Sequence, residues 1–439
     1  MKLQKSTPFN RMKAIWFEAG PAAHAGASRT MFNWQQNGQS VGMSCPRKGS
    51  QTIQMRDLTS LVKSSVSCLD EKLASLIPQS AGISLAKVQA SIDELTDDPS
   101  SKVSFLFSRS GSALFLPLVN KLYNALQAEL HDGDGAPNAK NIDQWLEKAQ
   151  DLLGSLSFAI SWTSGYPARA FQLLDTRFQC DGSHPRNIFH IEGLPVLAWP
   201  KSKGIWRRGT QTSLWVLPHA MRLPLYLYIA VIRQVQLKLM KELKRDTSLH
   251  TKYLFVHSTA SKPSNAMWTT AHLNSTVCKP KFPESFVFAL DDRHMRQLAK
   301  SIVAQHLPGL LLSREAASTA GALDGFTRQG GHNNATQEAH YGRINVPLGM
   351  SWIELRNCFA SSQVWQAFFE IAPLDDHWRS IYVDLPVRLQ IENRKVALDR
   401  ARFRIAKDYG IPASNPPETV TKVSEVLRQL PFLVRMPGF

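Results

Sequence analysis

The sequence predicts a mainly α protein with a small antiparallel β-sheet. Apolar residues recur at three- and four-residue intervals over several long segments, which is the pattern of amphipathic helices. Residues 186–217 instead contain short apolar runs separated by turns, which is typical of β-strands. The 439 residues, of which 43% are hydrophobic and 20% charged, suffice for a buried core and for two or three domains.

The first part of the chain is predicted to be helical after an irregular start. Residues 1–50 show no clear period, so we expect an arm of unclear structure, either irregular or made of short strands. The apolar spacing from 52 to 77 predicts an amphipathic helix, and two further helices are expected near 84–96 and 112–130. We therefore predict a helical domain over residues 51–135.

A short acidic and glycine-rich segment predicts the next boundary. Residues 131–138 combine aspartates, glycines and a proline between two helical patterns, so they are interpreted as an exposed linker. A helix then begins at Asn141 or Asp143, because both residue types are favoured N-caps. The second domain is predicted to cover residues 136–350.

The second domain is expected to surround the small sheet with helices. Strands are predicted within 186–217, and long helices over 218–244 and 292–306. Residues 259–285, rich in Ser, Thr, Asn, Lys and Pro, are expected to form a loop. Residues 351–439 are predicted to form a C-terminal helical extension.

Charge and cysteine usage restrict the class of partner and compartment. Lys and Arg number 51 against 35 Asp and Glu, and the net charge of +16 favours a polyanionic partner such as nucleic acid. The five cysteines lie far apart and never form a Cys-x-x-Cys pair, which favours a reducing compartment without disulfides or a zinc knuckle. The longest apolar run, 223–232, is too short to span a membrane, and we expect neither a membrane partner nor a secretory signal.

Five chemically informative residues follow one another in a fixed order. Arg169 ends the turn Gly-Tyr-Pro-Ala-Arg, Lys201 lies in the expected hairpin, and Arg296 lies on the helix that starts at Asp292. Further along the chain His332 follows a glycine, and Tyr341 comes nine positions after this histidine. With Arg293, which precedes Arg296 by three positions on the same helix, the candidate site residues are Arg169, Lys201, Arg293, Arg296, His332 and Tyr341.

This order resembles the catalytic domain of tyrosine recombinases, and the run from 186 to 201 is similar to the fungal Crypton-type branch. The resemblance covers about residues 140–345, with weaker similarity over 8–130, where the family carries a helical DNA-binding domain. It implies a recombinase or integrase of a mobile element that cuts and rejoins double-stranded DNA through a 3′-phosphotyrosyl intermediate. It further implies a homo-oligomer on DNA, a nuclear location, and no cofactor or metal.

The chemistry of strand transfer explains why such residues are collected. A phosphodiester under attack develops negative charge on its non-bridging oxygens. Guanidinium groups stabilise this charge with paired, planar hydrogen bonds. The resemblance thus makes Arg169 and Arg296 the phosphate clamp and Tyr341 the nucleophile. It makes Lys201, with Lys203 as the alternative, the general acid for the leaving 5′-oxygen, and it gives His332 a hydrogen bond to the scissile phosphate.

Two positions depart from the family pattern. Arg293 stands where the family often has a histidine three residues before the second arginine, and an arginine does not accept the phenolic proton near neutral pH. Gln172 stands where the family has an acidic residue three positions after the first arginine, so it offers a hydrogen bond but no charge. We therefore expect strand cleavage to be slower because of Arg293, and the clamp arginine Arg169 to be less firmly oriented because of Gln172.

Alternatives from other classes remain open at this point. Besides an active recombinase, the sequence is compatible with a degenerate DNA-binding protein on the same fold. A third hypothesis is a metal-dependent nuclease that uses Asp291 and Asp292 or Asp375 and Asp376. The basic segment 387–407 is interpreted either as a solvated helix face or as a DNA contact. The apolar helix 352–371 is either core or, by the resemblance, a helix that docks on a neighbouring protomer.

Overall fold

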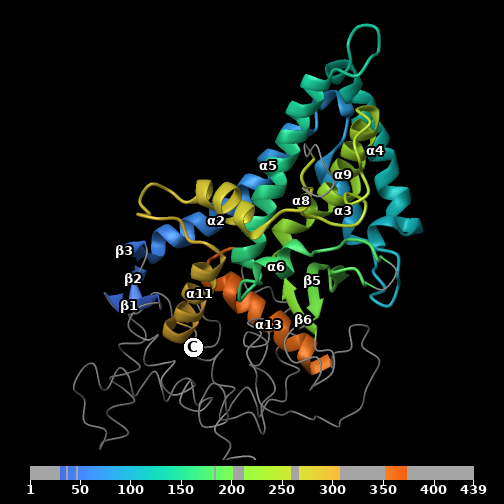
Figure 1. Ribbon diagram of the computed structural model, residues 1–439. Helices are drawn as coiled ribbons and strands as arrows, with labels where there is room; N and C mark the ends of the chain where they lie inside the picture. Colours follow the sequence, from blue (N-terminus) through green and yellow to red (C-terminus); the bar gives the residue numbers. More distant parts are fainter. Residues whose placement is uncertain are drawn as a thin grey trace, which may run out of the picture. The chain divides into compact units, whose positions relative to one another are not determined.

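The computed structural model describes residues 30–35, 38–45, 48–181, 184–200, 212–258, 266–306 and 352–372 (Figure 1), and the fold they form is mainly α with two small antiparallel sheets, as predicted for the class. All described residues belong to one compact unit. The main helices are α2 (Met55–Leu76), α3 (Leu85–Asp93), α4 (Arg109–Leu130), α5 (Ala139–Thr163), α6 (Ala170–Leu174), α8 (Arg222–Leu227), α9 (Arg233–Glu242), α10 (Thr270–His272), α11 (Asp292–His306) and α13 (Trp352–Phe368). The strands are β1 (Met31–Gln35), β2 (Ser40–Cys45), β3 (Gly49–Gln54), β4 (Ile188–Ile191), β5 (Leu194–Pro200) and β6 (Thr212–Val216).

The first sheet lies at the start of the described chain and has the order β1-β2-β3. Its strands are antiparallel, and Val41 of β2 pairs with Ile53 of β3, both of them buried. Of the two expectations for residues 1–50, short strands therefore hold for the described part. Since residues 49–54 pair with β2, α2 begins at Met55 rather than at Thr52 as predicted.

Helices α2 and α5 pack against each other and carry much of the core (Figure 1). The apolar stripe that predicted α2 is buried, as the exposed fractions of 0% at Leu58 and Leu69 show. α5 begins earlier than predicted, because the side chain of Asn138 rather than that of Asn141 or Asp143 caps it, accepting a hydrogen bond from the Asn141 N–H at 3.1 Å.

The predicted linker of residues 131–138 is an exposed turn between α4 and α5, which pack together. The turn closes on itself through a bridge between His131 and Pro137. The division into DNA-binding and catalytic domains at residue 135 stays a functional prediction, since both segments lie in one compact unit.

The second sheet has the order β4-β5-β6, in the region where strands were predicted. A nearly continuous helical stretch follows it, consisting of α8, a π-helical segment (Tyr228–Ile232) and α9. None of the helices that the structure describes is long and apolar enough to cross a membrane.

The expected loop at 259–285 is wrong for residues 270–281, which are helical. α10 continues into a π-helical segment (Leu273–Cys278) and a 3₁₀ turn (Lys279–Lys281). Two features that the polar composition does not indicate stabilise these turns. The side chain of Thr269 caps the first turn by accepting a hydrogen bond from the His272 N–H at 3.1 Å. Leu273 and Val277, one turn apart, are both buried.

The apolar helix α13 is core of its own chain. Trp365 and Phe369 are fully buried, and Leu355 and Phe359 nearly so. The indole N–H of Trp365 donates to the carbonyl of Trp162 in α5 at 2.6 Å. The core alternative for this helix is therefore confirmed, and docking on a neighbouring protomer stays a prediction.

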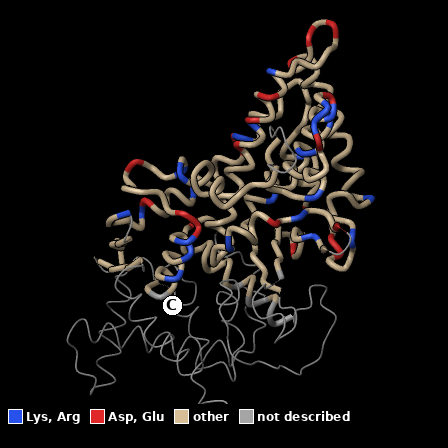
Figure 2. The backbone as a smooth tube through the Cα atoms, viewed as in Figure 1, with Lys and Arg blue, Asp and Glu red and all other residues tan. Residues whose placement is uncertain are grey.

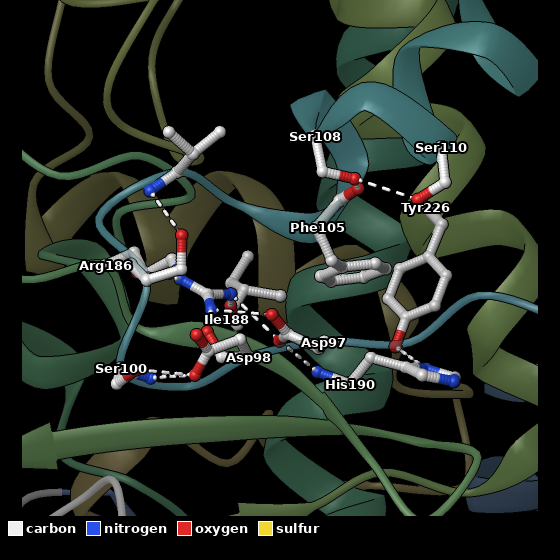
Figure 3. A network of polar contacts seen from close by, with 12 residues as sticks. Asp97, Asp98, Ser100, Phe105, Ser108, Ser110, Arg186, Ile188, His190 and Tyr226 are labelled. Atoms are coloured by element: carbon white, nitrogen blue, oxygen red, sulfur yellow. Dashed lines mark hydrogen bonds and ion pairs between the residues drawn. The ribbon is translucent and has the colours of Figure 1, made fainter.

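A buried ion pair joins the loop after α3 to the second sheet (Figure 3). Both nitrogens Nη1 and Nη2 of Arg186 donate to the carboxylate of Asp97, at 2.9 and 2.7 Å, and both side chains are only 1% exposed. The same carboxylate accepts the backbone N–H of His190 in β4 at 2.9 Å, and the His190 ring hydrogen-bonds Tyr226 of α8 at 2.9 Å. A bidentate geometry of this kind fixes the two segments relative to each other.

Candidate functional site

The first candidate arginine ends the loop of residues 165–169 between α5 and α6. Gly165 has a φ of +110°, a conformation that glycine adopts without steric cost. The N–H of Arg169 donates to the side-chain oxygen of Gln172 at 3.2 Å. Gln172 thus caps the first turn of α6 through the backbone of Arg169, while the guanidinium carbon of Arg169 lies 6.0 Å from the centre of the Phe171 ring.

Neighbouring elements hold this loop in place from two sides. The indole N–H of Trp215 in β6 donates to the carbonyl of Tyr166 at 2.7 Å. The hydroxyl of Ser362 in α13 donates to the carbonyl of Ser164 at 2.7 Å and accepts the N–H of Val216 at 3.2 Å. All five residues are buried, so the sheet and α13 together determine where the loop lies.

The second candidate arginine, Arg296, lies one turn into α11 and contacts the same loop. Its Nη1 donates to the carbonyl of Pro167 at 3.2 Å, and its guanidinium carbon lies 4.9 Å from the centre of the Tyr166 ring. This arrangement is a cation–π contact with a buried aromatic face. Arg296 therefore contacts the loop at Pro167, only two residues before Arg169.

The two arginines also influence each other electrostatically. Burial lowers the pKa of Arg296; the nearby Tyr166 and Asp292 oppose this effect, and the charge of Arg169 adds to it. Burial raises the pKa of Tyr166, and the charges of Arg296 and Arg169 reduce the rise. Both arginines therefore act on the same tyrosine, Arg296 through contact with the face of its ring and Arg169 through its charge.

Asp292 connects the start of α11 to the start of α6. Burial raises the pKa of this carboxyl, while Arg296, a hydrogen bond from the Ala170 N–H and Arg169 all act to lower it. Its own N–H donates to the side chain of Asn274 at 3.0 Å. One carboxylate thus interacts with both candidate clamp arginines, which is the charged contact that Gln172 does not provide.

Arg293 lies in the first turn of α11 and its side chain is exposed. Figure 2 shows that α11 begins with acidic residues and continues with basic ones, and that elsewhere Lys and Arg alternate with Asp and Glu over the described part. Arg296 is partly buried against the loop, whereas Arg293 is open to solvent. The two arginines of this helix therefore differ in environment.

The remaining candidates lie outside the described residues. Lys201 and the alternative Lys203 follow the last residue of β5, and His332 and Tyr341 belong to the stretch between α11 and α13. The structure therefore brings Arg169 and Arg296 to the same loop, shows Arg293 exposed in the first turn of α11, and leaves the other four assignments as predictions.

The acidic pair of the nuclease alternative does not converge. Asp291 contacts His294 and Lys48, whereas Asp292 faces Ala170 and Arg296. Within the described ranges, no group of three or more His, Cys, Asp or Glu side chains is arranged to hold a metal ion. Asp375 and Asp376 lie outside these ranges.

Sequence reasoning missed two residues of this site. Tyr166 stands inside the turn that singled out Arg169, but an aromatic residue in a turn carries no sign that an arginine will lie on its face. Asp292 precedes Arg296 by four residues, and this spacing places both on one face of a helix. That spacing was a usable signal for the charge interaction between Asp292 and Arg296, although not for the contact with Ala170.

Comparisons with protein-family models, with curated proteins and with solved structures each return no match to this chain.

Proposed function

We propose that the protein is a DNA strand transferase, a tyrosine recombinase or integrase of a mobile element, that acts on double-stranded DNA in the nucleus. A 3′-phosphotyrosyl link would conserve the energy of the broken phosphodiester, so that a 5′-hydroxyl reverses the step without ATP. The net charge of +16 favours the polyanionic substrate. Assembly as a homo-oligomer on DNA and the absence of a cofactor belong to the same proposal.

The observation that carries the proposal is the arginine pair. Arg169 and Arg296 are 127 positions apart in the sequence, yet both lie at the loop of residues 165–169, and Asp292 interacts with both. Two guanidinium groups beside one another are suited to a phosphate whose non-bridging oxygens gain charge during attack. Two like charges repel each other, so an arginine with a purely structural role gains nothing from a second arginine nearby, whereas a bound phosphate does.

The other roles follow from the resemblance. Tyr341 is the nucleophile, Lys201 or Lys203 protonates the leaving 5′-oxygen, and His332 hydrogen-bonds the scissile phosphate. Arg293, exposed in the first turn of α11, adds positive potential beside the clamp rather than acting as a base. Proton removal from Tyr341 then relies on other groups or on solvent.

The test is covalent trapping on nicked suicide duplexes carrying the element's candidate ends, in buffer containing excess EDTA. The wild type is expected to form a denaturation-resistant protein–DNA adduct, since charge stabilisation comes from side chains. Tyr341→Phe is expected to bind DNA nearly as well and to form no adduct, because only the nucleophilic oxygen is removed. Activity lost with EDTA and restored by magnesium would contradict the proposal in favour of the nuclease.

A catalytically degenerate DNA-binding protein is the second candidate. Arg293 and Gln172 favour it, because the family's proton-accepting and acidic positions are both changed. The two candidates differ in the trapping experiment: the degenerate protein binds duplex DNA with the salt dependence of phosphate contacts but gives no adduct with the wild type.

A further inference from the structure

A cysteine, a histidine and an aspartate contact one another in turn where the first sheet meets α11. Cys45 is the last residue of β2, and its Sγ lies 2.8 Å from Nε2 of His294 in the first turn of α11. The other ring nitrogen, Nδ1, lies 2.7 Å from Oδ1 of Asp291. The second oxygen of this carboxylate bonds Nζ of Lys48 at 3.1 Å. None of these contacts takes part in the proposed strand transfer.

The carboxylate is placed to orient the imidazole. Although burial alone would raise the pKa of Asp291, hydrogen bonds from His294 and Lys48 hold it below its usual range. An ionised carboxylate beside Nδ1 favours the ring proton on that nitrogen, which leaves Nε2 as an acceptor for the thiol proton. A nucleophile, a base and a group that orients the base are thereby arranged as in enzymes that activate a thiol.

We infer that Cys45 is a reactive thiol whose proton passes to His294 and that it reacts with hydroperoxides. In this step the thiolate sulfur attacks one peroxide oxygen, an S–O bond forms and the O–O bond breaks. The leaving hydroxide, in the case of hydrogen peroxide, takes the proton from the imidazolium ring and departs as water. The sulfur is oxidised by two electrons to a sulfenic acid, and the peroxide is reduced.

The surroundings of Cys45 select small reagents. The residue is 4% exposed and His294 is 8% exposed, and Val41 and Met43 on the same strand are buried as well. A thiol this enclosed is expected to exclude a bulky aromatic disulfide, so an oxidant that reaches it has to be as small as hydrogen peroxide. Reactivity toward small oxidants together with resistance to large thiol reagents is therefore the expected signature.

Two other cysteines of the chain serve as internal controls. Cys68 in α2 is more exposed than Cys45, but its thiol donates to the Ser65 carbonyl at 3.5 Å instead of facing an imidazole. Cys278 is buried, and burial with the nearby Asp292 and Asp291 raises the pKa of its thiol to about 12. We expect Cys278 to stay reduced, because only the thiolate is an effective nucleophile. We expect Cys68 to react more slowly than Cys45, because its thiol donates to a carbonyl, which does not take up the proton as an imidazole does.

The experiment treats the full chain with hydrogen peroxide for timed intervals, removes the peroxide with catalase, traps sulfenic acid with dimedone in denaturant so that every cysteine is accessible, and measures each cysteine by peptide mass spectrometry. In the wild type, Cys45 is expected to be labelled at least tenfold faster than Cys68. His294→Asn keeps a polar side chain but no proton acceptor of this strength, so it should reduce the Cys45 rate at least tenfold and leave the Cys68 rate unchanged. Cys45→Ser identifies the labelled peptide.

The wild-type measurement decides the inference even if His294→Asn fails to fold, which its circular dichroism spectrum would reveal. Labelling of Cys45 no faster than that of Cys68, or an unchanged Cys45 rate in a folded His294→Asn variant, would overturn it. Because the readout is oxidation of the thiol and not DNA cleavage, the result stands independently of the proposed function.

Discussion

Asp292 gives the arginine pair a charged partner from an unexpected direction. The resemblance places an acidic residue at position 172, and the chain has a glutamine there that caps α6 through the backbone of Arg169. Asp292 approaches from α11 instead, where it accepts the Ala170 N–H and interacts with both arginines. A less firmly oriented clamp stays a prediction, and Asp292 is the carboxylate through which it can be tested.

Asp292→Asn tests this role. Asparagine keeps the size and the hydrogen-bond acceptor for the Ala170 N–H but removes the charge between the arginines. We expect single-turnover cleavage to fall roughly tenfold, less than the loss of a clamp donor itself, while duplex affinity changes less than twofold. The comparison uses one nicked duplex for cleavage and a filter-binding series for affinity. An unchanged cleavage rate would remove Asp292 from the clamp.

Arg296 and Arg293 are expected to differ in their effect on cleavage. Arg296 is held against the loop of Arg169, whereas Arg293 is exposed in the preceding turn. Arg296→Ala should lower the single-turnover rate by roughly a hundredfold or more, as for other preorganised charge-stabilising groups. Arg293→Ala should lose far less. Equal rates for the two variants would show that this face of α11 does not contact the scissile phosphate.

Single residues with a local motif could be predicted from the sequence, whereas contacts between distant residues could not. Arg169 and Arg296 are recognisable because their neighbours form a motif in a fixed order. The contact of Arg296 with Tyr166 was not predictable, because it depends on how α11 meets a loop more than a hundred residues earlier. Likewise, Cys45 and His294 are 249 positions apart, and no local pattern relates them.

Elements with a strong apolar period were predicted best. The buried stripes of α2 and α13 required only a helical spacing of large apolar residues, and both helices are found. Their ends were less predictable, since β3 pairing decides where α2 begins. The turns at 270–281 were missed because their stability comes from burial of Leu273 and Val277 within a mostly polar composition.

The ion pair between the α3 loop and β4 is expected to be a large contributor to stability. Asp97→Asn leaves Arg186 buried without its charged partner, and such a loss typically costs about 3 to 5 kcal/mol. Asp175→Asn is the matched control, because Asp175 also pairs with an arginine, Arg177, but is 57% exposed, and we expect it to cost less than about 1 kcal/mol. Urea denaturation of the two variants makes the comparison. Equal losses would contradict the account.

His190 is expected to make this part of the fold sensitive to acid. Burial, assisted by the charge of Arg222 and opposed by Asp97 and Asp93, lowers the pKa of His190 to about 4. Below about pH 6.5 the unfolded chain takes up the proton first, so the folded state loses stability from there down to about pH 4, where the loss levels off. The total is on the order of 3 kcal/mol.

The measurement is urea unfolding of the wild type and of His190→Asn between pH 7 and pH 4. At pH 7 the wild type should be more stable, because it retains the hydrogen bond between His190 and Tyr226. The difference should shrink as the pH falls, since the variant lacks the titrating ring. Parallel curves for the two proteins would mean that His190 does not control this acid sensitivity.

At the scale of the molecule, the described fold brings distant segments to one site. Strand β6, α11 and α13 all contact the segment 164–169, although the sequence separates these elements by as much as about two hundred residues. The mainly α class was predictable from periodicity and one strand-rich region. The assembly of this site was not, because it depends on hydrogen bonds between backbone carbonyls and side chains of remote elements.

The most direct test of the central claim is to identify the residue that becomes linked to DNA. Wild-type protein is trapped on a nicked suicide duplex, digested with protease and nuclease, and analysed by tandem mass spectrometry. The account predicts one modified peptide, in which the oxygen of Tyr341 carries a phosphate esterified to the 3′ end of a nucleotide. A link to another residue, or to a 5′ end, would contradict it.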